Sequence, residues 1–436
     1  MTKLFSKVLK GSILISSLFL LTHMNVTAQM HCRSELAGHL TPFTEKVPLL
    51  WAVEGTMAPG IITKRRDGED PARISGGMLL AALDFSFLKN SNVYIEGGYK
   101  NWSNSIAGKK KNDDSRHVGV RQFFYGFKTD NTNVKLGLHE TKLGDYFLVD
   151  ERIFGASVDQ KAGAFEFNFR GGTVLKNFAR MGQFCANRHL YNLIKDDFTE
   201  NIGKKVGETN LAGMVVNWNP NYVKQKDNGS EDEFGEFSDM DSGGEFEEKS
   251  HFLSNVGIIV YDEFGKIIPD NKLYVGSLLD FNLPAKFTLQ TGAIYQNMSD
   301  NNAMVYIANL GRSVTWSSGA YTKFNAAYIG KYNVDDNALF QPLFSNMFLG
   351  EVMRMDAVDF PLWKASIKHN FPGKIKFDIT LKAVGQLEGN KTNEFDIESS
   401  LKLWNHVKLT GILSRVDTEA LPEVIYMARM EIRAFF

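Results

Sequence analysis

The chain ends with the stretch Val424-Ile-Tyr-Met-Ala-Arg-Met-Glu-Ile-Arg-Ala-Phe-Phe436, whose side chains alternate in character. One set is apolar throughout: Val424, Tyr426, Ala428, Met430, Ile432, Ala434 and Phe436. The other set carries three charges in succession: Ile425, Met427, Arg429, Glu431, Arg433 and Phe435. Successive side chains of a β-strand point to opposite faces. The stretch therefore predicts a strand with one apolar and one charged face.

The same period of two recurs upstream, at residues 93–100, 134–139, 165–170, 374–383 and 394–403. Helices would show a period of 3.6 instead. The mean hydropathy of −0.22 is no objection, because only alternate residues of a barrel strand face lipid. We predict an all-β fold, a transmembrane antiparallel β-barrel of about 18 strands. The alternative is about 16 strands, with a short helix near 178–202.

The predicted order of strands places two long segments, 140–163 and 333–358, in outer loops. It also places a strand at 176–185. The acidic stretch 224–250 then falls at the periplasmic end, where bacterial barrels usually have short turns. Either this is a rare long inner loop or the assignment of 176–210 is wrong.

The first residues have the three parts of an export signal. Lys3, Lys7 and Lys10 precede an uncharged apolar stretch, 11–21, and Val26-Thr27-Ala28 suits cleavage after Ala28. We expect a signal peptide at 1–28, a periplasmic N-terminal segment at 29–48 and an outer-membrane barrel at 49–436. The location follows as the bacterial outer membrane, with its lipid as the first partner.

Two features carry a resemblance. The terminal Phe436 looks like the C-terminal signal that the barrel-assembly machinery reads. The run VKLGLHETKLGDYFLVDERIFGASV, residues 134–158, resembles the corresponding region of alginate-export-type and related porin-like barrels. That resemblance implies a loop that narrows the pore, lined by Asp145, Asp150, Glu151 and Arg152. The other interpretation is an ordinary outer loop held by its own ion pairs.

Charged side chains gather on the inward faces of the last strands. The expected pore-lining set is Lys364, Lys368, Lys374, Lys376, Lys382, Arg429, Glu431 and Arg433. A basic cluster on one wall attracts anions, although Glu394, Asp396 and Glu398 would neutralise part of it. A general aqueous lumen remains the alternative.

The leading prediction is a porin-like channel for passive passage of small polar or anionic solutes. The alternative is a non-conducting structural or accessory subunit of a secretion, nutrient-uptake or barrel-assembly complex. Loop 333–358 would then bind protein partners through its apolar residues, or it would fold into the barrel mouth as a plug. The sequence has no hydrolase, metalloprotease or phosphate-loop motif and a net charge of −1. We therefore predict no enzyme, cofactor, metal site or nucleic-acid partner.

Cys32 and Cys185 are the only cysteines, and export to an oxidising compartment predicts a disulfide between them. Their Cα atoms would have to lie within about 7 Å. The predicted topology separates them by a hydrocarbon core about 25 Å tall. A bond therefore requires that 29–48 enter the lumen or that 176–210 is not an outward strand. Mass spectrometry of the unreduced protein tests the pairing, and two free thiols would reject it.

Overall fold

The structure is a computed structural model. It describes residues 35–44, 47–63, 72–104, 116–144, 147–175, 191–192, 203–222, 252–268, 270–299, 301–335, 337–344, 347–348, 350–355, 358–373, 375–389, 391–403, 406–419 and 423–436. Cys32, Cys185, Lys374 and Asp145 lie outside these ranges. Within them, no helix is long and apolar enough to cross a membrane.

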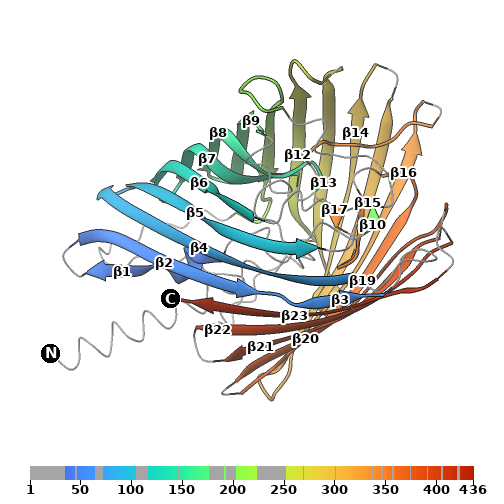
Figure 1. The fold of residues 1–436 in the computed structure, drawn as a ribbon. Helices are drawn as coiled ribbons and strands as arrows, with labels where there is room; N and C mark the ends of the chain where they lie inside the picture. The colour runs from blue at the N-terminus through green and yellow to red at the C-terminus, as the bar shows by residue number, and fades with distance from the viewer. Residues whose placement is uncertain are drawn as a thin grey trace.

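The described chain is almost entirely strand (Figure 1). The elements are η1 (Leu36–His39), β1 (Thr41–Thr44), β2 (Val47–Met57), β3 (Gly60–Ile62), β4 (Ala72–Leu88), β5 (Ser91–Asn104), β6 (Arg116–Lys128), β7 (Thr132–Leu143), β8 (Val149–Ala162), β9 (Phe165–Thr173), β10 (Tyr191–Asn192), β11 (Asn210–Trp218), β12 (Leu253–Phe264), β13 (Lys272–Leu283), η4 (Pro284–Lys286), β14 (Phe287–Asn297), β15 (Ala303–Thr315), β16 (Tyr321–Asn333), β17 (Met347–Phe348), β18 (Met353–Met355), β19 (Leu362–Phe371), β20 (Lys376–Gln386), β21 (Asn393–Leu403), β22 (Val407–Asp417) and β23 (Ile425–Phe435).

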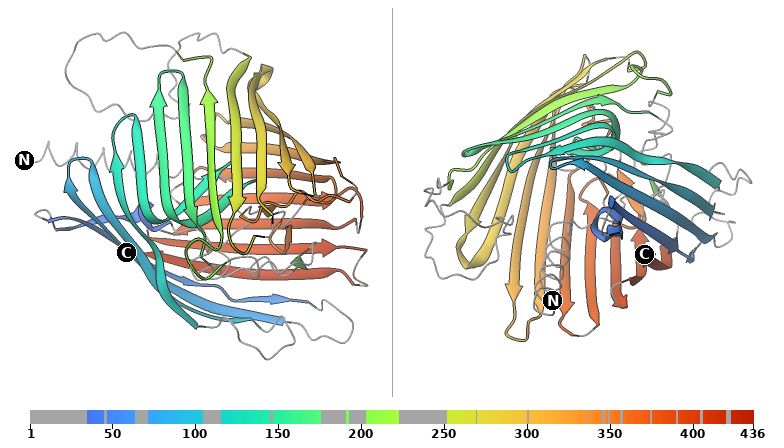
Figure 2. Two further views of the ribbon diagram at one scale, coloured as in Figure 1. Left: turned by 90° about the horizontal axis from the view of Figure 1, so that it is seen from above. Right: turned by 90° about the vertical axis from the view of Figure 1, so that its left-hand side faces the viewer.

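The sheet closes where the two ends of the chain meet. β2 and β3 act as one strand interrupted at Ala58 and Pro59, and both pair antiparallel with β23. Proline has no N–H to give to a ladder, which accounts for the break. The result is a closed antiparallel barrel of 18 strands, with blue β2 and β3 beside red β23 (Figures 1 and 2). The predicted fold class and strand number are confirmed.

The predicted alternation also holds in space. On β23, Tyr426, Met430 and Ile432 are exposed on the outer surface, whereas Arg429 and Glu431 are buried inside. The neighbouring strands repeat this, with outward Leu381, Phe395, Ile397 and Leu413 among the exposed side chains. Such an apolar exterior suits lipid and would be unfavourable against water.

One predicted loop is wrong. Residues 149–162 form β8, which pairs along its length with β7 and β9, so 140–163 is a hairpin rather than an outer loop. The alternation is lost there because Val149, Asp150, Glu151, Arg152 and Ile153 are all buried, whichever way they point.

The strand predicted at 176–185 has no place in the barrel. β9 pairs directly with β11, from Phe165 opposite Trp218 to Thr173 opposite Asn210. Residues 176–190 themselves lie outside the described part of the chain. One strand missed and one added leave the predicted total unchanged.

The barrel has two distinct ends. One end, called the short-turn end below, carries Phe436 and turns such as 89–90 and 163–164. β11 ends and β12 begins there, since Asn219 donates to the Ala164 carbonyl. The acidic stretch 224–250 lies between these two strands, and residues 223–251 are outside the described ranges. The other end, called the long-loop end, carries the connections 174–209 and 334–361.

The described part of the expected N-terminal segment lies against the lumen wall at the short-turn end. Leu36 is fully buried in a cluster with Ala52 and Leu80, and His39 stacks on Phe435 at 3.8 Å. The Glu35 carboxylate lies 2.8 Å from Arg433.

The environment of Glu35 gives this contact a pH dependence. Burial alone would raise the pKa of Glu35, but the Arg433 guanidinium and the Lys408 ammonium hold it down to about 2. The contact therefore contributes stability above the ordinary carboxyl pKa of 4.5 and loses it as the pH falls toward 2.

The last residue closes the seam, which generates a prediction. The Phe436 N–H donates to the Val53 carbonyl, and the Val53 N–H donates to the Phe436 carbonyl, both at 2.9 Å. Deleting Phe436 removes both bonds and the exposed aromatic ring of the last residue, and it leaves the buried Phe435 at the end of the chain. We expect a clear fall in the heat-modifiable, folded fraction on gels of outer membranes.

Phe436→Ala is the matched control, because it removes the ring and keeps both backbone bonds. A loss of folded protein in Phe436→Ala that is smaller than in the deletion variant would show that both the ring and the backbone bonds contribute to assembly. Normal assembly of the deletion variant would contradict a role for either.

Candidate pore constriction

Two elements fold inward at the long-loop end. The first is the tip of the β7–β8 hairpin, described at residues 139–144 and 147–153, and the second is the described part of the connection 334–361, called the crossing loop below. Their apolar side chains join inward-facing residues of the barrel wall in one buried cluster: Leu143, Phe147, Leu148 and Val149 from the tip and Phe340, Leu343 and Phe344 from the crossing loop. The long-loop half of the lumen is therefore occupied by chain.

The hairpin tip bends over the lumen side of the strands that follow it. Arg170 on β9 donates to the Lys142 carbonyl at 3.3 Å. Leu143 reaches β11, where a Cβ added to Gly213 would lie 2.5 Å from its Cδ2 atom. Glycine at 213 leaves the wall shallow enough to admit the leucine. The turn itself uses Gly144 at φ +59°, a backbone conformation that other residues rarely adopt.

The crossing loop begins along the β12–β14 wall. Glu263, fully buried, accepts the Leu343 N–H at 2.8 and 3.1 Å and the Tyr261 hydroxyl at 2.8 Å. Lys272 lies 3.9 Å from the same carboxylate and donates to the Gln341 carbonyl at 3.1 Å. A segment without regular structure is thus held through its backbone by side chains of the wall.

The hairpin tip and the crossing loop meet. Val149 and Phe344 form an isolated bridge, and the Asp150 N–H donates to the Phe344 carbonyl at 2.9 Å. Asp150, Glu151 and Arg152, expected in a loop, are instead buried on β8 at this junction. Their role in narrowing a pore stays a prediction.

The crossing loop then reaches the opposite wall. Glu351 lies 2.9 Å from Lys382 on β20 and 2.8 Å from Arg429 on β23. With β2 and β3 counted as the first strand, β12 is the ninth in the ring and β23 the eighteenth. The loop therefore spans the lumen between walls half the ring apart. The connection 174–209 also joins it, since β10 pairs with β18, which pairs with β17.

The described members of the expected pore-lining set occupy inward strand positions, and Lys368, Lys382, Arg429 and Arg433 each lie within ion-pair distance of a carboxylate. Lys382 contacts Glu351 and Glu398, Lys368 lies 3.5 Å from Asp378, and Arg433 contacts Glu431, Glu35 and Glu54. Lys364 is half-buried and Lys376 is exposed. The ion-paired basic side chains therefore do not form a cluster of uncompensated positive charge. Its effect on solute choice stays a prediction.

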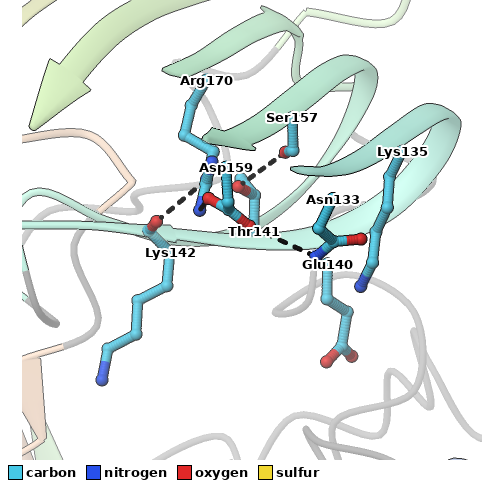
Figure 3. A pocket seen from close by; sticks show the side chains of 8 residues that line it. All are labelled: Asn133, Lys135, Glu140, Thr141, Lys142, Ser157, Asp159 and Arg170. Atoms are coloured by element: carbon cyan, nitrogen blue, oxygen red, sulfur yellow. Dashed lines mark hydrogen bonds and ion pairs between the residues drawn. The ribbon is translucent and has the colours of Figure 1, made fainter. Parts of the chain in front are cut away.

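The β7–β9 side of the lumen has a small polar hollow of about 90 Å³ (Figure 3). Its lining is Asn133, Lys135, Glu140, Thr141, Lys142, Ser157, Asp159 and Arg170. Arg170 lies 2.6 Å from Asp159, and the Lys135 ammonium lies 5.2 Å from the centre of the Phe124 ring. The hollow presents both signs of charge to the lumen. Three of its lining residues, Glu140, Thr141 and Lys142, belong to the hairpin tip, so the polar hollow is continuous with the tip.

Sequence reasoning missed Glu263 and Glu351. Glu263 follows the alternation of β12, because Ile259, Tyr261 and Glu263 are all inward and buried. The sequence pattern that could have identified Glu263 is a single glutamate at the end of the inward face of this strand. Glu351 lies in a segment without periodicity, where no pattern identifies it.

Comparisons with known proteins agree on the fold. No family model matches the chain, and no curated protein matches it by sequence. Solved structures do. OccK9 (OpdG) of Pseudomonas aeruginosa matches with a TM-score of 0.55 and 8% identity over 91% of this chain and 100% of that one. OccK5 (OpdH) of the same species matches with a TM-score of 0.54 and 9% identity, over 89% of this chain and 98% of that one. A BenF-like porin from Pseudomonas fluorescens Pf-5 matches with a TM-score of 0.52 and 10% identity, over 91% of this chain and 100% of that one. The chain has the fold of outer-membrane porins.

The anchoring of the crossing loop by Glu263 generates a prediction. Glu263→Ala leaves the Leu343 N–H without its acceptor, which costs about 1–3 kcal/mol for a buried group. We expect chymotrypsin to cut at Phe340 or Phe344 roughly five to 150 times faster, because cleavage follows local opening.

Glu263→Gln keeps an acceptor oxygen and should be cut more slowly than the alanine variant. Glu419→Ala, on an exposed turn, is the control for a lost carboxylate. Equal cleavage of Glu263→Ala and the unmodified protein would show that Glu263 does not hold the loop.

Proposed function

We propose that the chain is a porin-like channel of the outer membrane that lets small polar solutes pass without catalysis. The observation that carries this is a closed barrel with an apolar outside and a charged, ion-paired inside. In the short-turn half of the lumen, inward polar side chains such as Asp280, Gln290 and Lys323 are partly exposed, so they face water. Lipid outside and water inside are the surroundings of a channel wall.

The charges of the described wall favour small polar solutes of either sign over a strictly anionic class. Lys382, Arg429 and Arg433 each have a carboxylate within ion-pair distance, so the wall offers alternating hydrogen-bond donors and acceptors. Such a lining suits solutes that carry hydroxyl, amide or paired ionic groups.

The resemblance of residues 134–158 to alginate-export-type barrels supports a finer version of the proposal. In this version the β7–β8 hairpin tip forms the narrow part of the passage, with Asp150, Glu151 and Arg152 beside it. Burial of all three at the meeting point of the tip and the crossing loop supports this placement.

A second candidate is the non-conducting accessory barrel. One observation favours it: apolar side chains from both walls, the hairpin tip and the crossing loop fill the long-loop half of the lumen. Phe340, Leu343 and Phe344 are inside this cluster rather than on the surface. A partner would therefore have to bind through other residues than these.

Single-channel recording in a planar lipid bilayer tests the proposal. The folded protein should give discrete conductance steps. A variant in which residues 338–355 are replaced by a short Gly-Ser linker should give larger ones, because the crossing loop no longer spans the lumen.

A silent protein whose linker variant conducts would identify a plugged barrel and favour the accessory role. Silence from both, with folding confirmed by heat-modifiable migration, would reject the channel.

A further inference from the structure

Glu351 is a buried acid placed between two basic residues of the barrel wall. Its carboxylate is 1% exposed and lies 2.9 Å from the Lys382 ammonium and 2.8 Å from the Arg429 guanidinium. Lys382 and Arg429 belong to β20 and β23, which are separated by β21 and β22. A single loop residue therefore links two bases that the sheet holds several strands apart.

The backbone beside Glu351 is fixed to the same wall. The Val352 N–H donates to Glu394 at 2.7 Å, and the Glu351 N–H donates to Asp396 at 3.3 Å. A Cβ added to Gly350 would lie 2.1 Å from the Glu394 carboxyl carbon, so the glycine leaves room for the Glu394 carboxylate beside the loop backbone. Three consecutive residues thus place the Glu351 carboxylate at one position.

The local charges depend on this contact. Lys382 also contacts Glu398 at 3.0 Å. Lys382 and Arg429 supply two formal positive charges, and Glu351, Glu398, Glu394 and Asp396 supply four formal negative ones, so the six groups sum to −2 with the loop in place. Without Glu351 the same group of side chains has one negative charge less. Buried bases that lose a carboxylate remain charged, because arginine does not deprotonate and lysine keeps Glu398 as a partner.

We propose that Glu351 determines the charge preference of the channel, by neutralising Lys382 and Arg429 where the crossing loop meets the wall. This rests on the proposed channel function and specifies it further. Lys382, Arg429 and Glu398 belong to strands of the wall, whereas Glu351, which contacts both bases, is carried by a loop. Preference between anions and cations is then a property of the loop contact rather than of the wall alone.

The test is the reversal potential of single channels in a potassium chloride gradient. Glu351→Gln keeps the size and removes the charge. One unit of charge within about 10 Å of the passage should raise the permeability of chloride relative to potassium by roughly two- to tenfold. Glu419→Gln makes the same charge change on an exposed turn, and it should leave the ratio unchanged.

Two further variants separate charge from loop position. Glu398→Gln removes a charge beside Lys382 without touching the crossing loop, so it should shift the ratio with little change in conductance. Glu351→Gln should change both. The pair Glu351→Gln with Lys382→Gln restores the charge balance, so its ratio should return to that of the unmodified protein even where the single variant assembles poorly.

The outcomes are distinct. A conducting protein in which Glu351→Gln assembles normally and leaves the ratio unchanged would overturn the role of Glu351 alone. A double variant that keeps an altered ratio would also overturn it. No conductance from the unmodified protein would reject the channel function itself, and with it the selectivity role.

Discussion

Closure of the sheet by β23 against β2 and β3 is the constraint on which the rest of the structure depends. A backbone N–H or carbonyl left unpaired in hydrocarbon costs several kcal/mol, so a spanning sheet must have no open edge. The paired bonds between Phe436 and Val53 complete that closure at the short-turn end. Once the ring is closed, every strand has one face toward lipid and one toward the lumen. The side-chain alternation of the sequence is the direct consequence.

The lumen is then the only interior that can hold charge, and it is also wide enough to accept chain. A ring of 18 strands leaves more room than its own side chains fill. Here the hairpin tip and the crossing loop occupy that room and bring their own carboxylates with them. Glu351 contacts bases of the wall, and Glu263 of the wall holds the backbone of the loop. The wall and the loop therefore supply counter-charges and hydrogen-bond partners to each other.

The sequence predicted the parts of the fold in which one face is apolar and the other polar. β20 and β21 were identified because Leu381 and Phe395 face lipid while Lys382 and Glu394 face the lumen. β8 was not identified from the sequence. Its first five residues are buried on both faces of the strand, so its side chains do not alternate between apolar and polar. The candidate site was harder to predict from the sequence. Strand register placed the inward charges, but it did not give their ion-pair partners. Glu351 reaches Lys382 from a loop, and no local sequence pattern specifies the path of that loop.

The two ends of the crossing loop are held by different interactions. At the β12 wall, Glu263 accepts the Leu343 N–H, and Phe340 and Phe344 pack into the buried cluster. At the β20–β23 wall, Glu351 forms two ion pairs, and the Glu351 and Val352 N–H groups donate to Asp396 and Glu394. All of these groups are buried, where salt screens charges much less than at a surface. Detachment at either wall would therefore leave buried donors without acceptors, and detachment at the second would also separate Glu351 from Lys382 and Arg429 and so change the charge of the wall.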